Sequence, residues 1–190
     1  IGEFTVLEEI IRYIDNNEAN LELVIDNTEK LFCSLKNNDL DLILVEGNFD
    51  KEYFDYKLIS KEFFTGICSN EHPFANKNID IDDIYNSTLI IRERGSGSRE
   101  IFENLLNLQG NTIEKFNKII SVSSVNLITQ LVVRNKGISF GYEKIKYQKK
   151  ELSTFYVKEL SYFHEFNIVS LKGTGGLDKA ENFLKTTSNK

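Results

Sequence analysis

Apolar residues recur at two different spacings along this chain, and the spacing predicts which segments form helices and which form strands. Helical spacing, with apolar side chains three and four positions apart, is found at residues 5–14, 28–35, 101–106, 125–133 and 177–184. Short apolar runs typical of strands are found at residues 21–25, 40–45, 56–60, 63–69, 89–91, 119–122, 138–140, 152–157 and 166–171. Helices and strands alternate, which indicates an α/β fold with helices on the faces of a sheet.

Polar residues at the ends of these segments refine the prediction. Residues 40–45 are mostly apolar and partly β-branched, so we expect a buried parallel strand there. Asn27 and Thr28 are good N-caps for the second helix, and Ser124 is predicted to cap the helix at 125–133.

The composition is that of a folded protein with an acidic surface. The chain has 190 residues, 41% of them hydrophobic, which is enough for one large domain or two small lobes. Its formal net charge is -6, and because an acidic surface repels phosphate, the chain alone should bind nucleic acid poorly. No apolar run reaches the roughly 20 residues needed to cross a bilayer. The chain contains no methionine and opens on Ile1-Gly2, so we expect a part of a longer protein.

One loop carries candidate binding chemistry. Gly95-Ser96-Gly97-Ser98-Arg99 follows a predicted strand and opens a predicted helix. Its glycines allow a tight turn, and N–H groups at a helix start together with serine hydroxyls can bind an anion. The same residues also fit an ordinary helix cap with a structural arginine. The spacing matches neither a phosphate-binding P-loop nor the serine turn of hydrolases.

Residues suited to catalysis or metal binding are scattered. His72 precedes Pro73 in a polar loop, and we expect His164 to be a surface or loop residue. Cys33 and Cys68 lie far apart, which favours two free thiols over a redox-sensing pair. The two histidines and two cysteines give no metal-ligand spacing, so we expect no metal, no cofactor and no enzymatic activity.

Several motifs, in their order along the chain, resemble the effector-binding domain of LysR-type transcriptional regulators. They are the strand Leu40-Asp41-Leu42-Ile43-Leu44-Val45-Glu46-Gly47, the loop Glu71-His72-Pro73-Phe74-Ala75, the segment from Leu89 through the glycine-serine loop to Arg99, and residues 132–138. Arg94 stands where the family usually has proline, and Ser98 replaces its threonine.

The resemblance implies two Rossmann-like α/β lobes joined by two crossover strands, like a type II periplasmic binding protein. Residues 1–46 and 143–190 would form lobe I, and residues 47–142 would form lobe II. A small polar or anionic metabolite would bind between the lobes and control transcription. The winged helix-turn-helix that contacts DNA in this family would lie outside this chain.

Carried over by position, the ligand-binding candidates come from both lobes. They are Thr5, Val6, Thr28, Gly47, Ser96, Gly97, Ser98, Arg99, Ser124 and His164. The resemblance also implies a cytoplasmic protein that forms homodimers or tetramers, contacts DNA only through its missing N-terminal domain and does not associate with membranes. A free-standing solute-binding protein of the same fold is the chief alternative, and an enzyme using the glycine-serine loop is the third.

Overall fold

The computed structural model describes residues 7–16, 20–46 and 49–185. The chain divides into two compact units, one formed by residues 1–60 with 165–190 and the other by residues 61–164. We call them unit 1 and unit 2. Two long strands, β2 (Phe54–Ser69) and β7 (Tyr162–Leu171), contribute residues to both units. No helix within the described ranges is both long and apolar enough to span a membrane.

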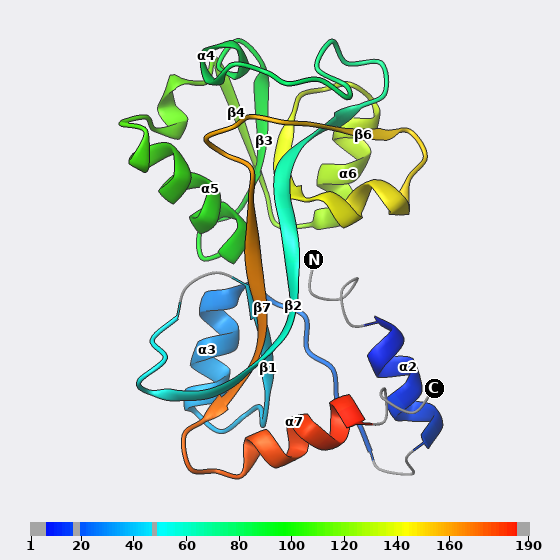
Figure 1. Cartoon of the computed structure of the whole chain (residues 1–190), viewed down its shortest axis with the longest axis vertical. Helices are drawn as coiled ribbons and strands as arrows, with labels where there is room; N and C mark the ends of the chain where they lie inside the picture. The colour runs from blue at the N-terminus through cyan, green and yellow to red at the C-terminus, as the bar shows by residue number, and fades with distance from the viewer. Residues whose placement is uncertain (1–6, 17–19, 47–48, 186–190) are drawn as a thin grey trace. The chain divides into compact units, whose positions relative to one another are not determined.

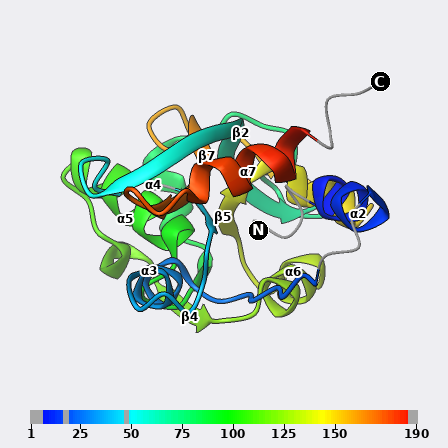
Figure 2. The same ribbon diagram turned by 90° about the horizontal axis from the view of Figure 1, so that it is seen from below.

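Within the described residues, unit 1 contains three helices and one short strand besides its parts of β2 and β7. They are α2 (Leu7–Asn16), α3 (Thr28–Lys36), β1 (Ile43–Glu46) and α7 (Gly176–Lys185). β1 pairs antiparallel with β7, so that Ile43 lies opposite Val169. α3 packs on this pair through Leu35, in a buried cluster completed by Phe54 of β2. α2 contacts α7, where the ring centroids of Tyr13 and Phe183 are 5.5 Å apart (Figures 1 and 2).

Unit 2 contains a parallel strand pair, an antiparallel group and the helices that cover them. The elements are α4 (Ile81–Ile84), β3 (Thr88–Arg92), α5 (Gly97–Leu108), η1 (Ile113–Lys115), β4 (Lys118–Val122), α6 (Val125–Val133), β5 (Ser139–Tyr142), η2 (Glu143–Gln148) and β6 (Leu152–Phe155). β3 and β4 run parallel, with Leu89 opposite Ile119. The second half of β2 pairs antiparallel with β5 and with β6.

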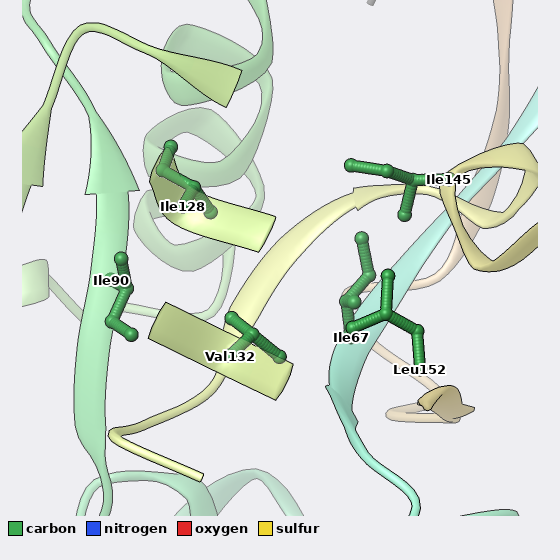
Figure 3. Close-up of a cluster of buried hydrophobic side chains, with 6 residues drawn as sticks. All are labelled: Ile67, Ile90, Ile128, Val132, Ile145 and Leu152. Carbon is green, nitrogen blue, oxygen red and sulfur yellow. The ribbon is translucent and has the colours of Figure 1, made fainter. Parts of the chain in front are cut away.

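The core of unit 2 forms where these two strand groups meet α6. Figure 3 shows one buried cluster of this core, with the six side chains Ile67, Ile90, Ile128, Val132, Ile145 and Leu152. They come from β2, β3, α6, η2 and β6, so burying them links segments far apart in the sequence. Burial of apolar surface of this kind is the main favourable term in folding.

Three strand predictions were wrong in the structure. Residues 21–25 form no strand; Ile25 is 75% exposed, and within the described ranges no neighbouring strand supplies the ladder that a strand requires. β1 has β7 as its partner and is antiparallel to it, although its buried apolar pattern predicted a parallel strand. Residues 56–60 and 63–69 belong to the single strand β2, because its backbone stays paired through the polar residues between them.

The units also divide at residues other than 46/47 and 142/143. Residues 50–60 belong with unit 1 because Phe54 is part of its core. Residues 143–164 belong with unit 2 because Ile145 and Leu152 are part of its core and β6 pairs with β2 at Gly66–Ser69. The lobe boundaries implied by the resemblance stay a prediction.

Candidate functional site

Two helix starts lie at one edge of the parallel pair in unit 2. β3 and β4 end in register, with Arg92 opposite Val122. The loop after β3 leads into α5, and the turn after β4 leads into α6 (Figure 1). Ligands of open α/β sheets bind outside the carboxyl ends of the strands, where helix starts present N–H groups. This edge is the candidate functional site of unit 2.

Two of the predicted serines lie buried at the start of α5. Ser96 is 3% exposed and Ser98 is 2% exposed, and their hydroxyl oxygens are 3.2 Å apart. Ser96 is the N-cap residue, but its side chain makes no capping hydrogen bond. The first bond of the helix runs from the Glu100 N–H to the Ser96 carbonyl, so the N–H groups of Ser98 and Arg99 have no acceptor within α5. Hydroxyl and amide donors therefore meet at this helix start.

The backbone of the loop explains why glycine precedes the first serine. Gly95 has φ 84°, a left-handed conformation that residues with a Cβ rarely adopt. It lets the chain turn sharply from β3 into α5 while Ser96 takes the extended conformation of an N-cap, with φ -82° and ψ 131°.

Ser124 caps α6 as the sequence predicted. Its hydroxyl oxygen accepts a hydrogen bond of 3.3 Å from the Leu127 N–H, and its carbonyl accepts the first helical bond from Ile128. Unlike the serines of α5, Ser124 is exposed to solvent. Its position at the end of β4 places a hydroxyl and a helix start at the same edge as Ser96 and Ser98.

Arg99 connects the helix and the two strands at this edge. The residue is 8% exposed, and its Nε donates to Glu103 Oε1 at 2.8 Å. Its Nη1 donates to the Arg92 carbonyl at 3.1 Å and lies 3.5 Å from the Ser121 hydroxyl. The guanidinium thus joins α5 to the last residues of β3 and β4. These contacts support the structural role that the sequence left open beside ligand binding.

The sequence reasoning missed Ser121 and Glu103 as parts of this site. Glu103 follows Arg99 by four positions on a predicted helix, a spacing at which opposite charges meet, so this contact could have been found. Ser121 gave no comparable signal, because its contact with Arg99 depends on the register of β4 against β3.

The remaining predicted site residues belong to other elements or lie outside the described residues. Thr28 is the first residue of α3 in unit 1. His164 is a residue of β7, not of a loop as predicted, and it is half-buried with its ring centroid 5.7 Å from that of Phe64. Burial lowers the pKa of His164 from its ordinary value of 6.5. Thr5, Val6 and Gly47 lie outside the described residues.

The two cysteines differ in their exposure to solvent. Cys33 is exposed, and Cys68 is buried in unit 2. Burial raises the pKa of Cys68 to about 12, which keeps it a protonated thiol at neutral pH. In the described part of the chain, no three histidine, cysteine, aspartate or glutamate side chains are grouped closely enough to hold a metal ion.

Two α/β units that share two long strands, with helix starts at a sheet edge, define a two-lobed binding domain of the type II periplasmic-binding-protein class. The regulatory domain of CcmR from Synechocystis PCC6803 has this fold, with a TM-score of 0.84 over 98% of this chain and 93% of that one, at 19% identity. The effector-binding domain of QuiR matches 95% of this chain and 89% of that one, with a TM-score of 0.78 and 18% identity.

The chain belongs to the family of LysR substrate-binding domains, whose sequence model matches residues 15–186. This is a family of ligand-sensing domains of transcription regulators, not of enzymes or free-standing solute-binding proteins. Curated relatives include the regulator CysL of Bacillus subtilis, 26% identical over 157 residues, and the regulator MJ0300 of Methanocaldococcus jannaschii, 29% identical over 137. These matches cover 77% and 70% of this chain. The matched region spans about half the length of each relative, 52% and 46%.

Proposed function

We propose that this chain senses a small polar or anionic metabolite, which binds at the starts of α5 and α6. The observation that carries the proposal is the meeting of two helix starts and three serine hydroxyls at one edge of the parallel β3–β4 pair. Such an edge supplies oriented N–H and O–H donors, and the positive end of each helix favours an anion. In this proposal Gly97 allows close approach of the ligand to the backbone, and Thr5, Val6, Thr28, Gly47 and His164 remain candidates for its other contacts.

The ligands of two structural neighbours support a small metabolite. The CcmR regulatory domain was solved in complex with 2-PG, and the QuiR domain in complex with shikimate. The hydroxyl groups of Ser96 and Ser98 have each other as hydrogen-bond partners, and in the described part of the chain no histidine or carboxylate accepts from either of them. Because a serine nucleophile needs an adjacent base, this geometry fits binding and not catalysis.

Two substitutions at Ser124 test the ligand site without removing the helix cap. Asparagine and aspartate cap helices about as well as serine, so Ser124→Asn and Ser124→Asp should fold normally. A thermal-shift screen with 2-PG, shikimate, sulfate and phosphate identifies a binding probe, and calorimetry measures its affinity. We expect Ser124→Asp to weaken binding of an anionic probe at least about tenfold through repulsion, and Ser124→Asn to change it much less.

Ser87→Asp is the matched control, since Ser87 follows α4 in unit 2 and lies outside the site. It should leave affinity unchanged. Equal affinities of Ser124→Asp, Ser124→Asn and the wild type would contradict the proposed site, as would stabilisation by neutral apolar compounds alone.

We further propose that the whole protein is a cytoplasmic transcription regulator that contacts DNA through a helix-turn-helix outside this chain. The relatives CysL and MJ0300 are helix-turn-helix regulators of about twice the matched length. The net charge of -6 agrees with an absence of DNA contacts by the chain itself. Electrophoretic mobility shifts should show no sequence-specific retention of operator DNA by this chain. Specific retention would refute the proposal that the DNA contacts lie outside this chain.

Exposed apolar residues in both units support the proposed homodimer, or a tetramer built from it. In unit 1, Ile14 of α2 is 55% exposed and Ile25 is 75% exposed. In unit 2, Leu108 of α5 is 78% exposed and Ile119 of β4 is 37% exposed. Contact between such surfaces of two copies would be self-complementary and closed. Light scattering should show a dimer at high micromolar concentration, and Ile25→Lys should shift it toward monomer; a strict monomer in the wild type would refute the proposal.

A further inference from the structure

A hollow of about 420 Å³ lies on unit 2 beside α5. Its volume is within the range of about 300–1,000 Å³ found for small-molecule sites. One wall is a face of α5 that carries Glu100, Glu103 and Asn107, spaced three or four positions apart. The loop before α5 contributes Arg94, and the segment around η1 contributes Glu114. Ser96 and Arg99 also line it, whereas Ser98 and Ser124 do not.

Two charged residues of this wall, Arg99 and Glu103, already pair with each other. Arg99 is paired with Glu103 at 2.8 Å and is held to the Arg92 carbonyl, so these two opposite charges cancel and the wall between them is fixed. The side chain of Arg99 is 9% exposed, which leaves it little freedom to turn toward a ligand. The pair therefore shapes the hollow without adding net charge to it.

Three charged groups of the hollow remain for a ligand. Arg94 and Glu100 are exposed, and neither side chain has a hydrogen bond or ion pair with the described residues. Glu114 is held as a carboxylate: a hydrogen bond from Thr112, then its own N–H, then the positive charges of Arg94 and Arg99 lower its pKa. The three exposed charged groups are thus one cation and two anions, on walls that come from different segments, and Glu114 also keeps its hydrogen bond from Thr112 and the attraction of Arg94.

The ligand that complements these three groups carries one anionic group and two cationic groups. We propose that the hollow is a second ligand site, which adjoins the serine edge at Ser96 and binds basic amino acids such as L-lysine or L-ornithine. The carboxylate of the amino acid pairs with Arg94, and its two ammonium groups pair with Glu100 and Glu114. Asn107 adds an amide that can accept from an ammonium group or donate to the carboxylate. Because the three charged groups are solvent-exposed, binding is weak and sensitive to salt.

Calorimetric titration with three probes tests the charge pattern. L-Lysine has the complementary set, 1,5-diaminopentane lacks the carboxylate, and L-glutamate has the opposite set. We expect L-lysine to bind saturably below about 10 mM, and L-glutamate not to. Arg94→Gln should lower the affinity for L-lysine about three- to tenfold and change the affinity for 1,5-diaminopentane by no more than about twofold. Glu100→Gln should lower the affinity for both L-lysine and 1,5-diaminopentane.

Arg134→Gln is the matched control, because Arg134 is an exposed arginine of unit 2 that follows α6 and whose guanidinium bonds to Gln130. It should leave the affinity for L-lysine unchanged. In ¹⁵N-HSQC spectra L-lysine should shift the amide signals of residues 94–103 and 112–114. Absence of saturable binding, equal effects of Arg94→Gln and Arg134→Gln, or equal binding of L-glutamate would each overturn the proposal.

The same titration separates this site from the proposed effector site. Ser124→Asp should leave L-lysine binding unchanged while it weakens the anionic probe found by thermal shift. Loss of L-lysine binding in Ser124→Asp would overturn the second site by placing both ligands at the serine edge. Retained binding of the anionic probe in Arg94→Gln, together with lost L-lysine binding, would support two independent sites.

Discussion

Replacing Arg99 should destabilise unit 2, because the guanidinium joins three elements. Arg99→Met keeps most of the apolar stem and removes the charged head. The ion pair with Glu103, whose side chain is 37% exposed, contributes about 0.5 kcal/mol after solvent screening. The bond of 3.1 Å to the Arg92 carbonyl contributes about 1 kcal/mol, and the contact of 3.5 Å with Ser121 adds little. The expected loss is about 1–2 kcal/mol in the free energy of unfolding.

Thermal unfolding followed by circular dichroism measures this loss. For a chain of this size, 1 kcal/mol shifts the melting temperature by about 2–4 °C, so Arg99→Met should melt about 2–8 °C lower. Arg99→Ala also removes the buried stem and should melt lower still. Arg134→Met is the control, since Arg134 is exposed, and it should change stability by less than about 0.5 kcal/mol. If Arg99→Met melts within about 1 °C of the wild type, the structural role assigned to Arg99 is wrong.

Three further predictions concern the core, the pH response and the thiols. Gly66→Ala places a Cβ into the Phe155 ring, so it should destabilise the chain by about 1–3 kcal/mol in urea unfolding, and Phe155→Leu should recover part of that loss. The pKa of His164 is lowered by burial, so unfolding takes up a proton as the pH falls below 6.5; stability should decrease from pH 7.5 to pH 5, and His164→Gln should lessen that decrease. Cys33 should react with a thiol reagent at pH 8 while buried Cys68, with its pKa raised to about 12, reacts only after unfolding. An unchanged free energy of urea unfolding in Gly66→Ala, a stability that does not change between pH 7.5 and pH 5, or rapid reaction of both cysteines with the thiol reagent would contradict the respective prediction.

Local sequence patterns predicted the helices and caps well, because their determinants lie within a few residues. Asn27 caps α3 by accepting from the Lys30 N–H, and Ser124 caps α6 by accepting from the Leu127 N–H. The glycine-serine loop could be placed before a helix because Gly95 permits a left-handed turn. These contacts involve residues at most three positions apart, so the sequence shows both partners.

The strand pairings could not be predicted in the same way, because a strand is defined by a partner that can lie anywhere in the chain. The apolar run at residues 21–25 looks like a strand in isolation, yet it has no ladder in the described structure. The buried residues of β1 fit a parallel strand equally well, but its neighbour is β7, more than a hundred residues away and antiparallel. The alternation of apolar residues specifies which face is buried, not which strand lies beside it.

The sequence by itself determined the α/β class, the family resemblance and the serines at two helix starts, since each of these is written in local patterns or in ordered motifs. Only the tertiary structure decided what those residues contact. Ser98 faces the hydroxyl of Ser96, while Arg99 turns to Glu103 and to the ends of β3 and β4. The opposite charges of Arg94 and Glu114, twenty residues apart, line one hollow because η1 folds back beside α5. Side-chain partners depend on register and packing, which long-range burial fixes and short-range sequence does not.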